Sequence, residues 1–154
     1  FYTEDEIGEI IKRSAKILDI DIHNDAIKAI ASRSRFTPRA ANYFLKRCRD
    51  YAQIEKSPLS KEIVEKALKM LGVDHLGLNG ADRDILKTMI EKFGGGPVGL
   101  NTIAAALSEE QATIEEVYEP YLIQLGLLER TPKGRVATDK AFNHLNIKTG
   151  GKLL

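Results

Sequence analysis

Three cations, Arg130, Lys133 and Arg135, surround a Pro-Lys-Gly turn in the stretch RTPKGRVAT, residues 130–138. Proline and glycine take the second and fourth positions, as a type I turn prefers, and the flanking LLER and RVAT predict the two strands of a β-hairpin. Cations at such a tip can neutralise phosphates without reading bases, so these residue types favour a contact with a nucleic-acid backbone. A hairpin whose charges serve only solubility is the alternative that this pattern leaves open.

The charge of the chain is distributed unevenly along its 154 residues, although the formal net charge is only +1. Residues 1–74 carry a net charge of +2, residues 79–129 hold three basic and nine acidic residues, and residues 130–154 hold six basic residues against Asp139 alone. Phosphate repels acidic side chains at short range, so if this domain binds nucleic acid we expect the hairpin to make the contact and the acidic helix before it to face protein. The acidic residues on or just before that helix are Glu109, Glu110, Glu115, Glu116 and Glu119.

The cysteine and histidine residues predict no catalytic or metal chemistry. Cys48 is the only cysteine, so no disulfide can form within the chain, and a structural thiol in a reducing compartment is favoured over a nucleophile. His23, His75 and His144 lie far apart in the sequence, without a spacing typical of metal ligands. We therefore expect no metal site.

Two glycine patterns in the sequence do not predict a nucleotide site. Gly94, Gly96 and Gly99 fit the bare G-x-G-x-x-G spacing, but they follow a helical pattern and Pro97 interrupts them, so a turn and a short strand are expected instead. Residues 150–152, Gly-Gly-Lys, lack the upstream glycine and the Ser or Thr of a P-loop. The chain should therefore not hydrolyse ATP by itself.

Apolar residues at helical spacing, separated by helix-start signals, predict four helices and no strand in residues 1–72. The third helix should run to about Gln53, and Gly72 should end the fourth. The expected N-terminal caps are Thr3 in a capping box with Glu6, Asn24, Thr37 followed by Pro38, and Ser60.

The glycine-rich stretch GVDHLGLNGAD, residues 72–82, marks a domain boundary. After it we expect a helix near 82–93, a glycine turn with a short strand, and a helix at 101–107. A capping box at Thr113–Glu116 should open the next helix, and Pro120 should kink or delay it. The hairpin and a last helix around 141–145 should follow. This order is typical of a winged helix-turn-helix domain. The expected fold is mainly α: a four-helix domain over residues 1–74, then a winged helix with a small β-hairpin wing over 75–154.

Three long blocks of the sequence resemble the RuvB family of bacterial Holliday-junction branch-migration ATPases: FGGGPVGLNTIAAALSEE, TIEEVYEPYLIQLGLLERTPKGRVAT and RSRFTPRAANYFLKRCRDYA. The resemblance runs from Phe1 to about Ile147. Members of this family are AAA+ motors with a nucleotide-binding domain, a helical lid and a winged-helix DNA-binding domain. The resemblance implies that residues 1–74 are the lid and 75–154 the winged helix. Since the chain begins with Phe1 rather than Met, we expect it to be part of a longer protein.

The resemblance implies two nucleotide-binding positions in the lid. Tyr2 matches a tyrosine beside the bound nucleotide, and Arg39 matches the sensor-2 arginine, a catalytic residue that reaches the γ-phosphate from the lid. A place in the first turn of a helix suits this role, because the helix dipole there attracts anions. Phe36 replaces the glycine that usually precedes Thr-Pro-Arg, and it would strain the turn if the backbone there requires a positive φ.

In the second domain the resemblance assigns DNA contacts to the hairpin. Arg130 and Arg135 match DNA-contacting wing arginines, and Lys133 stands where an arginine is common, so it would act as a point charge on phosphate. A further family contact falls at Gln111, which supplies no charge. That contact should therefore be weak or absent in this chain.

At the level of the whole protein, the resemblance implies a homo-hexameric motor of recombination, DNA repair and the SOS response in the bacterial cytoplasm. It would act on duplex DNA at Holliday junctions with RuvA, and with RuvC in the resolving complex. ATP and Mg²⁺ would be bound mainly by the nucleotide-binding domain, and this part alone should hold neither. No run of about 18 apolar residues predicts a membrane span.

Two alternatives of other classes stay open. One is a winged-helix transcriptional regulator, which should carry a basic, polar recognition helix aimed at base edges. The other is a winged helix used only for protein–protein contact, which the acidic helix favours.

Overall fold

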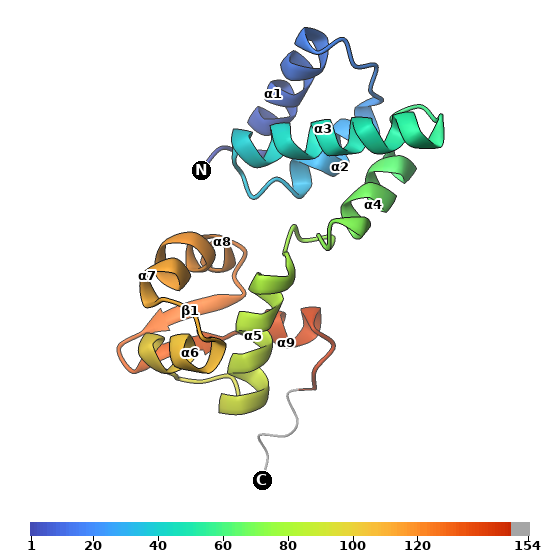
Figure 1. The fold of residues 1–154 in the computed structure, drawn as a ribbon. Helices are drawn as coiled ribbons and strands as arrows, with labels where there is room; N and C mark the ends of the chain where they lie inside the picture. Colours follow the sequence, from blue (N-terminus) through green and yellow to red (C-terminus); the bar gives the residue numbers. More distant parts are fainter. Residues whose placement is uncertain (149–154) are drawn as a thin grey trace. The chain divides into compact units, whose positions relative to one another are not determined.

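The computed structural model describes residues 1–148, and residues 149–154 lie outside the described part, with the end of the expected second domain and the Gly150–Lys152 stretch among them. The chain forms two compact units, Phe1–Asn79 and a second that begins at Gly80 (Figure 1). The change from one unit to the next falls within the glycine-rich stretch 72–82. The expected fold class is confirmed, since a four-helix unit precedes a helical unit with one two-stranded hairpin.

The first unit is built from helices α1 (Glu4–Ile17), α2 (Asn24–Ser32), α3 (Pro38–Glu55) and α4 (Lys61–Met70) (Figure 1). Helix α1 packs on α2 and α3, and α4 packs on the same two helices. The packed faces carry the apolar residues at helical spacing, and their burial supplies the main stabilisation of the unit. The largest fully buried side chains of this unit are Ile7, Ile11, Ile30, Leu45, Leu68 and Leu78.

Three of the four predicted N-terminal caps are confirmed. Thr3 forms the capping box with Glu6, Thr37 accepts a hydrogen bond from the Ala40 N–H at 3.3 Å, and Ser60 caps α4 in the same way.

The cap predicted at Asn24 is wrong, because Asn24 is the first residue of α2 and His23 holds the cap position without a side-chain hydrogen bond. The start of α2 is fixed by tertiary pairing instead. The His23 N–H donates to the Leu59 carbonyl at 3.3 Å, and Ile22 forms a parallel bridge with Leu59.

The second unit follows the order expected of a winged helix (Figure 1). Strands β1 and β2 pair antiparallel, with Leu128 opposite Ala137 and Thr131 opposite Gly134. The strand expected after the glycine turn is a single antiparallel bridge between Val98 and Arg135. The elements are α5 (Gly80–Phe93), α6 (Leu100–Leu107), α7 (Gln111–Thr113), the π-helix η1 (Ile114–Tyr118), α8 (Glu119–Gln124), β1 (Leu128–Thr131), β2 (Gly134–Ala137) and α9 (Asp139–His144).

The capping box predicted at Thr113–Glu116 is wrong. Thr113 lies within the helical run, which begins at Gln111 after Glu110 in the cap position. The turn η1 then widens, and the Glu119 N–H donates to the Ile114 carbonyl five residues back. Pro120 follows directly and has no N–H to donate, so the disturbance that the sequence predicts takes the form of a π-turn just before the proline.

Candidate nucleic-acid interface

The β-hairpin of the second unit carries the three predicted cations. Lys133 is exposed in the turn between the strands, and Arg130 stands directly opposite Arg135 in the register of β1 and β2. Two like charges at opposed positions of a hairpin repel each other. The pair therefore needs a neighbouring anion to hold its side chains together.

That anion is Glu119, the first residue of α8, whose side chain is fully buried. Its Oε1 accepts hydrogen bonds from Arg130 Nη2 at 2.8 Å, Arg130 Nε at 3.2 Å and Arg135 Nη2 at 3.2 Å, and its Oε2 accepts one from Arg135 Nε at 2.7 Å. Burial acts to raise the pKa of Glu119, but hydrogen bonds from Arg135 and Arg130, with their charges, outweigh it and lower the pKa. Glu119 is thus ionised near neutral pH and bridges both arginines.

The position of Glu119 corrects the description of the acidic helix. Glu109, Glu110, Glu115 and Glu116 are exposed, as a solvated acidic face requires, whereas Glu119 turns inward to the hairpin. Its spacing of three residues from the buried Leu122 could have indicated an inward position, but no sequence pattern indicated its partners. The two arginines and Glu119 together carry a net charge of +1.

The hairpin tip is held by the side chain of Thr131, which hydrogen-bonds to backbone groups of the turn. The Thr131 hydroxyl donates to the Gly134 carbonyl at 2.8 Å and accepts from the Lys133 N–H at 3.3 Å. Gly134 has a φ of 132°, and a Cβ there would lie 2.7 Å from the carbonyl oxygen of Val98, so glycine is required at this point. The cations therefore stand on a turn of defined conformation.

Gln111, which matches a further DNA contact of the family, lies at the exposed start of α7. Within residues 1–148 no hydrogen bond joins Gln111 to the wing arginines, so the structure does not link it to the hairpin cluster.

The two predicted nucleotide-binding residues of the first unit come from neighbouring segments. The Tyr2 N–H donates to the Phe36 carbonyl at 3.1 Å, and Arg39 follows three residues later in the first turn of α3. Both side chains are exposed, and Arg39 makes no hydrogen bond or ion pair with any described residue. An arginine that is free and close to a helix N-terminus can bind an anion supplied from outside the unit.

The turn before α3 has the positive φ angles at which phenylalanine is strained. Arg35 and Phe36 both have a φ of 54°, in the left-handed region that favours glycine. Each such residue costs about 1–2 kcal/mol in backbone strain. The ring of Phe36 packs edge-on against Phe1, with 6.3 Å between centroids, and this contact offsets part of the strain.

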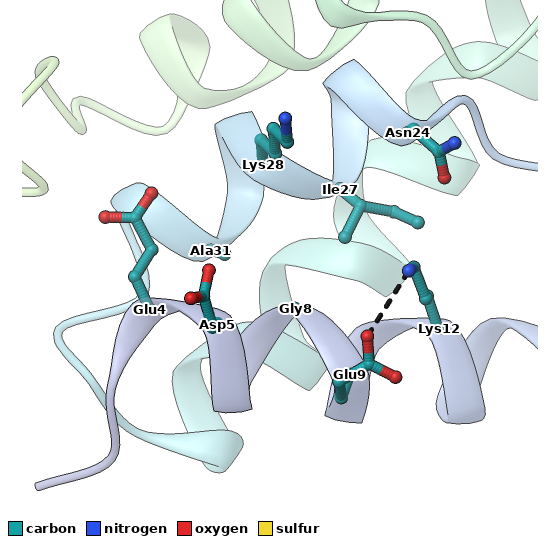
Figure 2. A pocket seen from close by; sticks show the side chains of 9 residues that line it. All are labelled: Glu4, Asp5, Gly8, Glu9, Lys12, Asn24, Ile27, Lys28 and Ala31. Carbon is teal, nitrogen blue, oxygen red and sulfur yellow. Dashed lines mark hydrogen bonds and ion pairs between the residues drawn. The ribbon is translucent and has the colours of Figure 1, made fainter.

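A groove of about 330 Å³ lies between α1 and α2 (Figure 2). Side chains of both charge signs line it, among them the ion pair of Lys12 and Glu9 at 3.3 Å. Neither Tyr2 nor Arg39 lines this groove, so it is not the expected nucleotide site.

The remaining chemical groups offer no active site in the described part of the chain. Cys48 is buried, and burial raises the pKa of its thiol to about 12, against the opposing charge of Arg33, so the thiol is unreactive at neutral pH. Among residues 1–148 no group of histidine, cysteine and acidic side chains could hold a metal ion, and no helix is long and apolar enough to cross a membrane.

A four-helix unit followed by a winged helix-turn-helix unit with a basic hairpin defines the fold class of the chain. The family model described as the RuvB AAA lid domain matches residues 2–74, and that described as the RuvB C-terminal winged helix domain matches residues 75–146. The chain belongs to the RuvB family and contains its lid and winged-helix regions.

The curated relatives that match are much longer than this chain. A Holliday junction branch migration complex subunit RuvB from Dehalococcoides mccartyi is 55% identical over 148 residues, which are 96% of this chain and 42% of the relative. The corresponding RuvB of Solibacter usitatus is 51% identical over 96% of this chain and 43% of its own length. The chain therefore spans less than half of the length of these relatives.

Solved structures of the Thermotoga maritima RuvB Holliday junction branch migration motor have the same fold. One of them is 50% identical, with a TM-score of 0.94, over 96% of this chain and 50% of that chain. The R170A variant of the same protein matches equally.

Proposed function

We propose that this chain is the C-terminal part of an ATP-dependent DNA motor that drives Holliday-junction branch migration in recombination and DNA repair. Residues 1–74 act as the lid that senses nucleotide, and residues 75–154 act as the winged helix that grips duplex DNA. The observation that carries the proposal is the hairpin with its three cations, Arg130, Lys133 and Arg135. The helical segment that precedes this hairpin in the same unit exposes acidic residues instead. Contacts with phosphates alone suit a translocating motor, since base-specific contacts would trap it on preferred sites.

In this chain, only residues of the lid would contact the nucleotide. Arg39 fits a phosphate ligand because it is cationic, exposed, free of partners among the described residues and in the first turn of α3. Tyr2 lies on the segment bonded to the same turn. A nucleotide-binding domain present in the longer relatives would hold ATP and Mg²⁺, which supply the phosphoryl-transfer chemistry.

The proposed partners follow from the RuvB family. The complete protein would form a homo-hexamer on duplex DNA beside a junction, with RuvA and, during resolution, RuvC, in the bacterial cytoplasm. The exposed acidic residues of the α7–α8 region suit a protein contact better than a DNA contact.

The transcriptional-regulator alternative is not favoured, because the helix that would enter the major groove and the two residues just before it expose four glutamates and no basic residue. A winged helix used only for protein contact is also not favoured, since the exposed positive charge of the hairpin would then have no external ligand.

A salt titration tests the DNA contact. We expect this chain to bind a duplex with an affinity that falls steeply with NaCl. The double variant Arg130→Gln with Arg135→Gln should make the negative slope of log K against log salt shallower by about 1 to 2 units. The change should be nearer 1 unit, because Glu119 already offsets one of the two positive charges. The control pair Lys87→Gln and Lys92→Gln removes the same charge from the exposed face of α5 and should leave the slope unchanged. A slope equal to that of the unmodified chain in the arginine variant would refute the wing assignment.

ATP turnover of the complete protein tests the lid residue. Arg39→Ala should lower turnover by about 10²-fold, because a cation aimed at the transferring phosphoryl group is lost. Arg47→Ala, an exposed arginine further along the same helix, serves as the control and should turn over ATP normally. Normal turnover in Arg39→Ala would make Arg39 an ordinary surface residue.

A further inference from the structure

The wing arginines do not present their whole guanidinium groups to solvent. Each arginine donates to Glu119 through Nε and Nη2, and Nη1 of each takes part in none of these hydrogen bonds. The side chain of Arg130 is 47% exposed and that of Arg135 is 19% exposed. One edge of each planar group is thus fixed against a buried carboxylate, and the other edge is left for a ligand.

The backbone that carries Glu119 departs from a regular helix directly before it. The π-turn η1 ends where the Glu119 N–H donates to the Ile114 carbonyl, and Pro120 comes next. A π-turn adds a residue to the helical turn and rotates the residues after it relative to their places in a regular α-helix. The irregular turn and the burial of Glu119 beneath the hairpin are two separate observations at the same residue.

We propose that Glu119 is a positioning residue of the DNA contact: it holds Arg130 and Arg135 side by side with their Nη1 groups available for phosphates, and does not itself touch DNA. The inference rests on the proposed function of the hairpin. It extends that function by naming an acidic residue that strengthens phosphate binding.

Two physical effects of Glu119 on DNA binding have opposite signs. As an anion close to the interface it weakens attraction to phosphate, so its loss would tighten binding if charge alone mattered. As a clamp it orders the side chains of Arg130 and Arg135 when the unit folds. Their conformational entropy is then already lost before DNA binds, so ordering them does not weaken the binding free energy. The proposal is that the second effect is the larger.

Three single variants separate these effects by duplex binding, measured as fluorescence anisotropy of a labelled duplex over a range of NaCl. Glu119→Gln removes a negative charge and replaces one acceptor oxygen by an amide NH₂, and we expect about 5- to 50-fold weaker binding. Glu119→Asp keeps the charge but shortens the side chain, and it should also bind more weakly. The control Glu116→Gln makes the same charge change at an exposed residue of η1 and should bind as the unmodified chain does, or more tightly.

Binding by Glu119→Gln that equals or exceeds that of Glu116→Gln would overturn the positioning role. A double-mutant cycle identifies the residues through which Glu119 acts. In a chain with Arg130→Gln and Arg135→Gln, adding Glu119→Gln should not weaken binding further. A further loss in that background would also overturn it.

Failure of the inference and failure of the proposed function are distinguishable. If the arginine double variant binds as the unmodified chain does, the hairpin is not the DNA contact and the proposed function fails. If the arginine variant loses binding while both Glu119 variants retain it, only the inference fails.

A measurement on the unmodified chain avoids dependence on the folding of Glu119 variants. The Nε–H groups of Arg130 and Arg135 donate to a buried carboxylate, so their NMR signals should be protected from exchange with water and should persist when duplex is added. Loss of this protection on DNA binding would mean that the clamp opens, and would overturn the proposal.

Discussion

The wing arginines should stabilise the winged helix as well as contact DNA. They supply all four hydrogen bonds that Glu119 accepts from side chains, and Glu119 is fully buried. In a variant with both Arg130→Ala and Arg135→Ala, the folded state must either keep an unpaired buried carboxylate or protonate it. Either outcome lowers the free energy of unfolding.

The size of this loss follows from the exposure of the three side chains. Removing one side of a buried ion pair costs about 3–5 kcal/mol. Arg130 is 47% exposed, so part of its interaction is screened by water, and trimming both arginines lets water approach the carboxylate. We therefore expect a loss of about 2–3 kcal/mol, which for a domain of this size lowers Tm by about 10–20 °C.

The effect depends on pH in a direction that the pKa of Glu119 fixes. In the unmodified chain the arginines lower this pKa in the folded state. The pairing therefore contributes its full stability at pH values above the pKa of an unfolded glutamate, about 4.3, and this contribution is lost as the pH falls through the lower pKa of the folded state. Without the arginines, burial alone raises the pKa above its unfolded value. The stability difference between the two chains should therefore shrink as the pH falls from about 7 to about 4.

Thermal unfolding followed by circular dichroism measures the loss, and hydrogen exchange of the α8 and β1 amides assigns it to the second unit. Adding Glu119→Gln to the double variant should restore most of the loss at neutral pH, because a neutral amide replaces the unpaired charge. The control pair Lys87→Ala and Lys92→Ala should stay within about 0.5 kcal/mol of the unmodified chain. A double variant as stable as this control, or one that Glu119→Gln does not restore, would show that the two arginines do not stabilise the unit through Glu119.

Three further predictions concern backbone conformation and the buried thiol. Lys56 ends α3 with a φ of 51°, so Lys56→Gly should stabilise the first unit by about 0.5–1 kcal/mol, whereas Gln53→Gly inside the same helix should destabilise it by about 1 kcal/mol; urea unfolding compares them. Gly134→Ala should destabilise the second unit by about 2 kcal/mol or more, since its Cβ would lie 2.7 Å from a backbone oxygen, while Gly80→Ala, which meets open space, should change Tm little. Burial raises the pKa of Cys48 to about 12, so a thiol reagent should label it only as urea unfolds the first unit; rapid labelling of the native chain would contradict its burial.

Local sequence patterns determined most of the element order. The caps at Thr3, Thr37 and Ser60 involve partners within three residues, so a short window of sequence contains the whole interaction. The hairpin was predicted for the same reason, because Pro and Gly at fixed turn positions restrict the backbone locally.

The two caps that the local sequence pattern predicts incorrectly, at Asn24 and Thr113, both concern where a helix begins. The start of α2 depends on the pairing of Ile22 and His23 with Leu59, more than thirty residues away in the sequence. The capping box expected at Thr113 does not form, because the helical run begins at Gln111 and places Thr113 inside it, just before the π-turn at Ile114–Tyr118. Propensity is a weak signal, and tertiary contacts readily override it.

The family, the two regions and the cluster of cations on the hairpin are all evident in the amino-acid sequence. The role of Glu119 depends on the tertiary structure, because its partners lie eleven and sixteen residues away on strands β1 and β2. Along the sequence Glu119 counts as one acid on an acidic helix. Once buried, its charge requires Arg130 and Arg135 as partners, because a carboxylate removed from water is stable only when cations and hydrogen bonds replace its hydration.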